Sequence, residues 1–209
     1  DGRVITPTCS HAPGSDPAYR FWAKRGATNN LVVYFDGGGA CWDGATCSAP
    51  HLRASADDAD TFYKAELLPA DDPNRMQGIF DLTNTANPLR DWSFVFVPYC
   101  TGDVHSGSNT ATYTNPQTHE QFSIEHRGAD NFRVVMAWIR QNFDAPQEIL
   151  VTGSSAGAYG AVTHYTEVRD AFPSGRAFML GDAGQGVTTD AFIAERNHNW
   201  NFQLPTSVY

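Results

Sequence analysis

The pentapeptide Gly153-Ser154-Ser155-Ala156-Gly157 constrains the fold of this chain more than any other feature. An apolar run precedes it at 148–152, and a stretch of helical character follows at 158–168. Gly-x-Ser-x-Gly between a strand and a helix is typical of a tight turn that exposes its middle residue at the strand's carboxyl end. Small neighbours are needed there, because larger side chains would collide with the strand or helix. The alternative is an ordinary Gly/Ser-rich loop, but the flanking elements favour the turn, so Ser155 is the candidate nucleophile.

The apolar pattern predicts an α/β fold. Short runs rich in β-branched or aromatic residues indicate buried strands, and longer stretches with apolar residues at helical spacing indicate amphipathic helices. Their alternation favours a mostly parallel central sheet flanked by helices, and the length suits a single domain over 1–209. The expected strands are 31–35, 92–98, 148–152 and 177–180, and the expected helices are 129–143 and 158–172.

Two segments have little periodicity. Residues 100–121 are rich in Thr, Ser, Asn and Gly, so we expect a long exposed loop over the carboxyl edge of the sheet. Such loops often carry substrate contacts, and a floppy insertion is the alternative. Residues 182–209 contain only weak periodicity, with aromatic side chains frequent near their end.

The four cysteines, Cys9, Cys41, Cys47 and Cys100, lack the Cys-x-x-Cys spacing of many zinc sites. Cys41 and Cys47 flank a loop short enough to close locally, which leaves Cys9 for Cys100. Three pairings are possible in principle, and four reduced thiols are the alternative. Disulfides favour an exported protein, extracellular or periplasmic. The chain opens Asp1-Gly2-Arg3 without a signal peptide, which a processed mature chain would explain.

Charge and hydropathy exclude some partners. The net charge of −9 argues against nucleic acid, since phosphates need a basic face. No apolar run approaches the roughly 20 residues that span a bilayer. No metal or organic cofactor is expected, and we expect a monomer.

A second glycine-rich turn provides a candidate oxyanion hole. The expected strand 31–35 runs into Asp36-Gly37-Gly38-Gly39-Ala40, and a glycine turn after an early strand offers unobstructed backbone N–H groups. The N–H of Ala156, beside the nucleophile and at a helix N-terminus, would be the second donor. A tight structural turn or a phosphate loop is the alternative, but no Walker lysine follows.

The general base and its acid are harder to find. His164 falls in the middle of a predicted helix, His198 lies in a polar segment that we expect to be a loop, and Asp182 ends the strand 177–180. Asp103 and His105 precede the serine, so we interpret them as loop-ordering or substrate-lining residues, with a solvated polar loop as the alternative. A full hydrolase sheet needs two more strands, so we expect that the chain is a fragment whose acid and base lie beyond Tyr209.

Four segments stand out along the chain: YFDGGGACW at 34–42, VPYCTGDVHSG at 97–107, GSSAGAYG at 153–160 and GDAG at 181–184. Together they resemble the pectin acetylesterase and Notum family of carboxylesterases, and bacterial secreted members more than the animal protein. The resemblance implies an α/β-hydrolase fold, possibly without its last strands. It also implies Ser155 as nucleophile, the N–H groups of Gly38 and Ala156 as oxyanion donors, and the pairs Cys41–Cys47 and Cys9–Cys100. It makes Asp182 a structural residue near the site.

The resulting hypothesis is a secreted serine carboxylesterase that cleaves acetyl or other acyl esters through a Ser155 acyl-enzyme. Its expected substrate is an acylated carbohydrate polymer such as pectin, by analogy with the family. A broad-specificity esterase or polyester hydrolase is one alternative. An inactive fragment, or a non-catalytic binding protein on a hydrolase scaffold, is another.

Overall fold

A five-stranded sheet forms the centre of the computed structural model, which describes residues 4–53, 60–186 and 188–202. The strand order is β1-β5-β2-β8-β9, and all neighbours are parallel except β1 and β5. The predicted mostly parallel sheet is therefore confirmed, while the short antiparallel strand β1 was not predicted. The strands are β1 (Trp22–Lys24), β2 (Asn30–Phe35), β5 (Ser93–Val97), β8 (Glu148–Ser154) and β9 (Arg176–Asp182).

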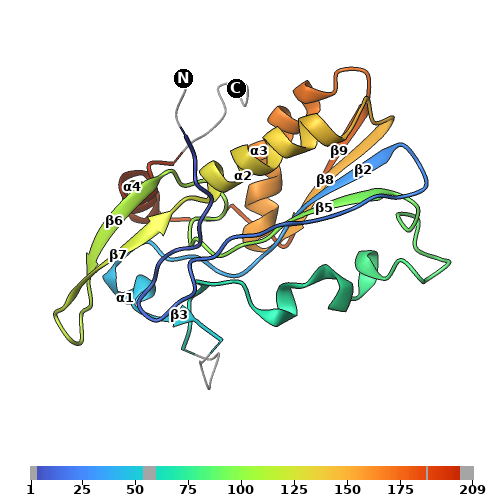
Figure 1. The fold of residues 1–209 in the computed structure, drawn as a ribbon. Coiled ribbons are helices and arrows are strands. Elements are labelled where there is room, and N and C mark those ends of the chain that lie inside the picture. The colour runs from blue at the N-terminus through green and yellow to red at the C-terminus, as the bar shows by residue number, and fades with distance from the viewer. Residues whose placement is uncertain (1–3, 54–59, 187, 203–209) are drawn as a thin grey trace.

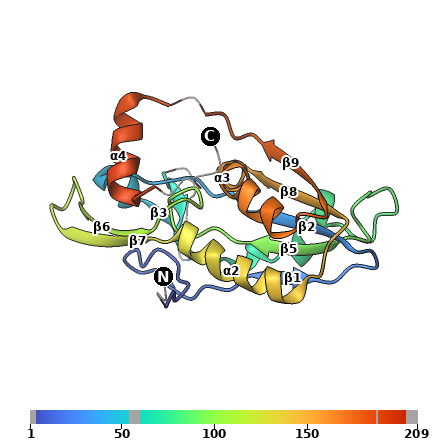
Figure 2. The same cartoon turned by 90° about the horizontal axis from the view of Figure 1, so that it is seen from above.

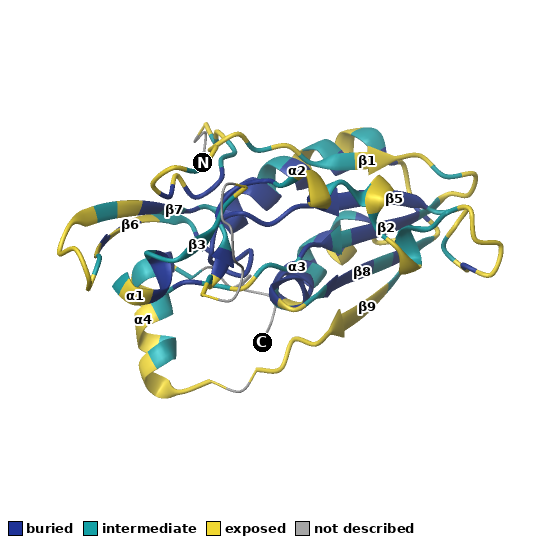
Figure 3. Ribbon diagram, turned by 90° about the horizontal axis from the view of Figure 1, so that it is seen from below, coloured by how far each residue is buried: buried dark blue, intermediate teal, exposed yellow. Residues whose placement is uncertain are grey.

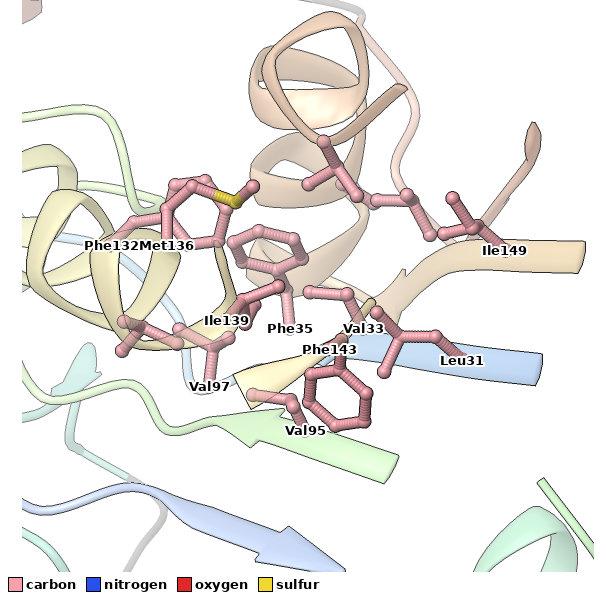
Figure 4. Close-up of a cluster of buried hydrophobic side chains, with 14 of the residues drawn as sticks. Leu31, Val33, Phe35, Val95, Val97, Phe132, Met136, Ile139, Phe143 and Ile149 are labelled. Atoms are coloured by element: carbon pink, nitrogen blue, oxygen red, sulfur yellow. The ribbon is translucent and has the colours of Figure 1, made fainter. Parts of the chain in front are cut away.

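Alternation along β2 gives the sheet two apolar faces. Leu31, Val33 and Phe35 lie in the main core, together with side chains of β5, β8 and the helices (Figure 4). Tyr34 points the other way and its ring contacts those of Phe80 and Phe96. A strand buried on both faces needs an almost unbroken apolar sequence, which explains why β2 is recognisable from its residues alone.

Helices cover these two faces unequally. The long helices α2 (Gly128–Asn142) and α3 (Ala156–Ala171) lie on one face (Figure 1), where Phe132, Met136 and Ile139 of α2 are buried. Both were predicted, within one to two residues at each end. The opposite face is covered in part by a segment of three short 3₁₀ helices, η1 (Pro69–Asp71), η2 (Pro73–Arg75) and η3 (Gly78–Phe80).

A smaller group of elements lies at one end of the sheet (Figure 2). Its residues correct two predictions. The expected exposed loop 100–121 is buried over residues 101–107 and then enters a β-hairpin, and His198 lies in a helix instead of a loop. The elements are α1 (Gly44–Cys47), the two-residue strands β3 (Pro50–His51) and β4 (Tyr63–Lys64), the hairpin β6 (Asn109–Thr114) and β7 (Gln121–His126), and α4 (Asp190–Trp200).

Two disulfides join these parts. Cys9 is bonded to Cys100, and Cys41 to Cys47, so both expected pairs are present. The first ties the N-terminal segment to the residues that follow β5. The second joins the last residue of α1 to Cys41, and the intervening Trp42 and Asp43 connect the glycine turn to the helix.

Strand β9 differs from the prediction of four buried strands. Phe178 is 48% exposed and Leu180 59% exposed (Figure 3). Among the described strands β9 pairs only with β8, and α3 packs against one of its faces. The apolar sequence identified a strand correctly, but the burial of a strand depends on its neighbours, which its own residues do not specify. No helix among the described residues is long and apolar enough to cross a bilayer.

The strand order places a topological switch point at the carboxyl ends of β2 and β8. These two strands are adjacent, with Phe35 opposite Gly153. The next sheet strand after β2 is β5, on one side, whereas the strand after β8 is β9, on the other. The loops that leave β2 and β8 therefore diverge, and ligands of open α/β sheets bind at such points.

Candidate active site

Ser155 occupies the tight turn between β8 and α3. Its backbone has φ 55° and ψ −121°, a conformation that a residue with a side chain rarely adopts, and its side chain is exposed. The Ser155 N–H donates to the main-chain oxygen of Asp182 at 2.9 Å, which ties the turn to the end of β9. Such strain persists only where the surrounding structure enforces it, and it is common at functional sites. The hydroxyl has no hydrogen-bond partner among the residues that the structure describes.

The glycines of the pentapeptide allow β2, β8 and α3 to approach closely. A Cβ atom at Gly157 would overlap the carbonyl oxygen of Phe35 in β2. This backbone contact cannot relax as a flexible side chain would. The requirement for small residues around Ser155, expected from the sequence, therefore has a direct geometric cause.

The turn after β2 lies against the serine turn. The position of a Cβ on Gly37 is 3.3 Å from the Cβ of Ser155. Gly38 has φ 151° and Gly39 φ 74°, which is the region that favours glycine. No described residue accepts a hydrogen bond from the Gly38 N–H. Ala156 begins α3, and the first N–H groups of a helix have no partner within it.

Asp103 and His105 lie behind this turn and are buried, so the alternative of a solvated loop is wrong. The Asp103 carboxylate accepts hydrogen bonds from the Thr101 hydroxyl and from three backbone N–H groups, those of His105, Gly107 and Gly128. Burial raises the Asp103 pKa, and these hydrogen bonds oppose that rise. The two residues therefore order the loop, which is one of the two roles that we expected for them from the sequence.

The His105 ring reaches the turn itself. Its Nε2 donates to the carbonyl oxygen of Asp36 at 2.8 Å. Burial lowers the His105 pKa to about 3, so the ring is neutral at ordinary pH. A neutral, buried imidazole that is bonded through Nε2 to Asp36 fixes the position of the turn, and no contact between this ring and the Ser155 hydroxyl is described.

The other candidates for base and acid also have different surroundings. His164, in the middle of α3, donates from Nε2 to the main-chain oxygen of His105 at 2.8 Å and stacks on Phe35. His198 is exposed on α4. The Asp182 carboxylate accepts from the hydroxyl of Ser154, at 3.0 Å, and no hydrogen bond to a histidine is described for it. None of these three side chains has a described contact with the Ser155 hydroxyl.

A buried ion-pair group under the glycine turn was not found from the sequence. The Lys64 ammonium bonds to the carboxylates of Asp36 and, at 2.8 Å, Asp71. Burial raises the pKa of Asp36, and the Lys64 charge opposes the rise. Burial alone would lower the Lys64 pKa, but the two carboxylates raise it overall, so Lys64 carries its charge. Lys64 lies in a two-residue strand with no sequence signal, so only the three-dimensional structure reveals it.

Aromatic side chains line the region beside the serine turn. Trp42 and Phe192 meet edge to face with ring centroids 5.0 Å apart, and both pack in a cluster that includes Ala156. Tyr159, one helical turn after Ser155, belongs to the same cluster. These rings offer apolar surface for stacking next to the candidate nucleophile.

One group of potential metal ligands occurs among the described residues, and its donor atoms are already bonded. Among the described residues, Cys41, Cys47 and His126 form the group whose donor atoms lie within 4.8 Å of one another. The two sulfurs are bonded to each other, and both His126 ring nitrogens are engaged, with the Tyr113 hydroxyl and the Thr101 carbonyl oxygen. These residues therefore lack the free thiolates and imidazole nitrogen that a metal would need.

Comparison with known proteins places this geometry in a family. The sequence profile of the pectinacetylesterase family matches residues 8–204. The chain belongs to this family. Pectin acetylesterase 11 of Arabidopsis thaliana is 30% identical over 175 residues, which is 82% of this chain and 41% of that protein. The palmitoleoyl-protein carboxylesterase NOTUM of Schmidtea mediterranea is 24% identical over 162 residues, 75% of this chain and 28% of that protein.

A solved structure supports the same fold. The Wnt deacylase Notum from Drosophila superposes with a TM-score of 0.61 at 22% identity, covering 96% of this chain and 58% of that one. The predicted α/β-hydrolase fold and the resemblance to the pectin acetylesterase and Notum family are thus confirmed. The chain spans about two fifths of the length of the first curated pectinacetylesterases that it matches.

Proposed function

We propose that this pectinacetylesterase-family protein is a secreted serine carboxylesterase that removes acetyl or other acyl groups from polysaccharides such as pectin. The observation that carries the proposal is the strained, exposed Ser155, in contact with a glycine turn and at the N-terminus of α3. The family match supports ester hydrolysis as the reaction. The two disulfides support secretion, because such bonds persist in oxidising compartments.

In the proposed mechanism, the Ser155 hydroxyl attacks the ester carbonyl carbon and the alcohol leaves. The resulting acyl-enzyme is then hydrolysed by water, which releases the carboxylic acid and restores the serine. The N–H groups of Gly38 and Ala156 stabilise the negative oxygen of each tetrahedral intermediate. Loss of one such donor costs roughly 2.7–4 kcal/mol of transition-state stabilisation in other hydrolases.

The mechanism also needs a base and an acid to orient it. We assign this role to none of His105, His164, His198 and Asp182. The rings of His105 and His164 are buried and donate hydrogen bonds to main-chain oxygens. His198 and Asp182 have no described contact with the Ser155 hydroxyl.

The test measures acetate release from acetylated pectin by the natural full-length protein. We expect Ser155→Ala to lower the rate at least ~1000-fold, because the covalent pathway is lost. Ser154→Ala is the matched control in the same pentapeptide, and most of its activity should remain. Equal rates for wild type and Ser155→Ala would contradict the proposal.

A broad-specificity esterase or polyester hydrolase is the second candidate. The aromatic cluster of Trp42, Tyr159 and Phe192 suits this candidate as well as the first, because such rings stack on aromatic polymers and on sugars. Hydrolysis of an aromatic polyester in the same assay, without acetate release from pectin, would select this candidate. Absence of both activities would favour a non-catalytic binding protein on a hydrolase scaffold.

A further inference from the structure

The loop between β2 and α1 forms part of the proposed site and is not held in place by regular secondary structure. It contains three consecutive glycines and has no regular secondary structure apart from one bridge, between Gly39 and Tyr63. Glycine gives a backbone great freedom, and fixing it carries a large entropic cost. An oxyanion donor must nevertheless be held within a fraction of an ångström to be effective. Something outside the turn must therefore hold Gly38 in place.

Lys64 contacts the glycine turn through both its side chain and its backbone. Its ammonium bonds to the carboxylate of Asp36, the residue that precedes the glycines. Its backbone N–H donates to the carbonyl oxygen of Gly38 at 2.8 Å. The lysine stem also lies so close to Gly38 that a Cβ there would overlap Lys64 Cε. One residue thus holds the side chain before the glycines, the carbonyl of the middle glycine and the space beside it.

The charges in this group are largely removed from water. The side chains of Lys64, Asp36 and Asp71 are 15%, 12% and 7% exposed. Replacing a buried ion pair by apolar residues is often neutral or stabilising, because desolvation offsets most of the attraction. Stability alone is therefore a weak explanation for a lysine and two carboxylates here. Their direct contacts with the glycine turn suggest a role in its geometry.

We propose that Lys64 and Asp36 are positioning residues that fix the Gly38 N–H in the orientation that an ester oxyanion requires. Asp71 holds the Lys64 ammonium from the far side, with its carboxylate also accepting from the Leu68 N–H at 2.7 Å. His105 fixes the Asp36 carbonyl oxygen at the same time. The inference rests on the proposed function, since it concerns the same oxyanion hole.

The test compares Asp36→Asn with Asp130→Asn in the ester hydrolysis assay. Asp36→Asn removes the charge that Lys64 holds at the turn but keeps the size and the backbone. We expect kcat to fall about 10- to 100-fold with KM nearly unchanged, because a displaced donor weakens transition-state binding more than substrate binding.

Asp130→Asn is the matched control. Asp130 is also a buried carboxylate in ion pairs, with Arg127 and Arg133, but it lies on α2 away from the turn. We expect wild-type kcat from it. Equal losses of kcat in the two variants would overturn the inference. So would a higher KM with unchanged kcat in Asp36→Asn.

A further variant covers failure to fold. If Asp36→Asn does not fold, Asp36→Glu keeps the charge and displaces it by one methylene group. A folded Asp36→Glu with wild-type kcat would also overturn the inference, whereas a selective loss of kcat would support it. The outcome is separate from the proposed function, because an inactive wild type fails that proposal before any variant is compared.

Discussion

The backbone of Ser155 stores strain that its neighbours must enforce. With φ at 55°, the residue is stable only because β2, β8 and α3 meet around it, and Gly157 makes this approach possible. A serine is therefore recognisable as a candidate nucleophile only together with the glycines that flank it. The contacts that hold this turn are made by main-chain atoms.

Gly157→Ala should destabilise the fold by about 3 kcal/mol or more, since the new methyl group meets the Phe35 carbonyl oxygen and backbone must move. Urea unfolding measures the loss. Gly186→Ala is the control, because nothing lies within 4 Å of a Cβ at that position. Its free energy of unfolding should stay within about 0.5 kcal/mol of wild type. Similar losses for both variants would contradict the close approach of β2 and α3.

Among the elements, the β6–β7 hairpin is held by a buried histidine. His126 at the end of β7 donates from Nδ1 to the Thr101 carbonyl oxygen and accepts at Nε2 from the Tyr113 hydroxyl. This arrangement requires the neutral ring. Burial lowers the His126 pKa to about 4, and the charge of Arg127 acts in the same direction. The hydrogen bond to Thr101 and the charge of Glu125 act in the opposite direction and raise the pKa in part.

The hairpin's contribution to stability should therefore depend on pH. The unfolded chain binds a proton at His126 near pH 6.5, whereas the folded chain resists it down to about pH 4. The stabilisation is complete above pH 6.5 and falls as the pH is lowered toward 4, by about 2–3 kcal/mol at pH 4.5. Urea unfolding at pH 7 and 4.5 measures this difference, and His126→Gln should reduce it by that amount.

His119→Asn, in the exposed turn of the same hairpin, should leave the pH dependence unchanged. Other buried groups also contribute to the pH dependence, so the comparison between these two variants is decisive. An unchanged pH dependence in His126→Gln would show that the ring is not held neutral.

At the scale of the whole molecule, the sequence predicted what local pattern controls. The strands of the sheet centre and the helices α2 and α3 follow from apolar spacing, because burial on defined faces leaves a periodic record. The turns around Ser155 and Gly38 were predicted because glycine is needed where chains approach closely. These parts agree with the structure to within one or two residues.

The parts that were missed depend on contacts between distant residues. Residues 101–107 are polar in sequence yet buried, because Asp103 gathers donors from its own loop and from the start of α2. His198 is helical although its neighbours are polar, since α4 is anchored by Trp200, whose indole N–H donates to the Cys41 carbonyl oxygen. Lys64 acquires its importance only when β4 meets the glycine turn. No local pattern contains that information.

The central claim is that Ser155 is the nucleophile of a serine carboxylesterase, and covalent labelling tests it most directly. The natural full-length protein is incubated with a fluorophosphonate. Mass spectrometry of the intact protein and of its peptides then identifies the modified residue. We expect one adduct, on the peptide that contains Ser155, which is absent in Ser155→Ala and present in Ser154→Ala. A folded wild-type protein that forms no adduct, or forms it on another serine, would contradict the claim.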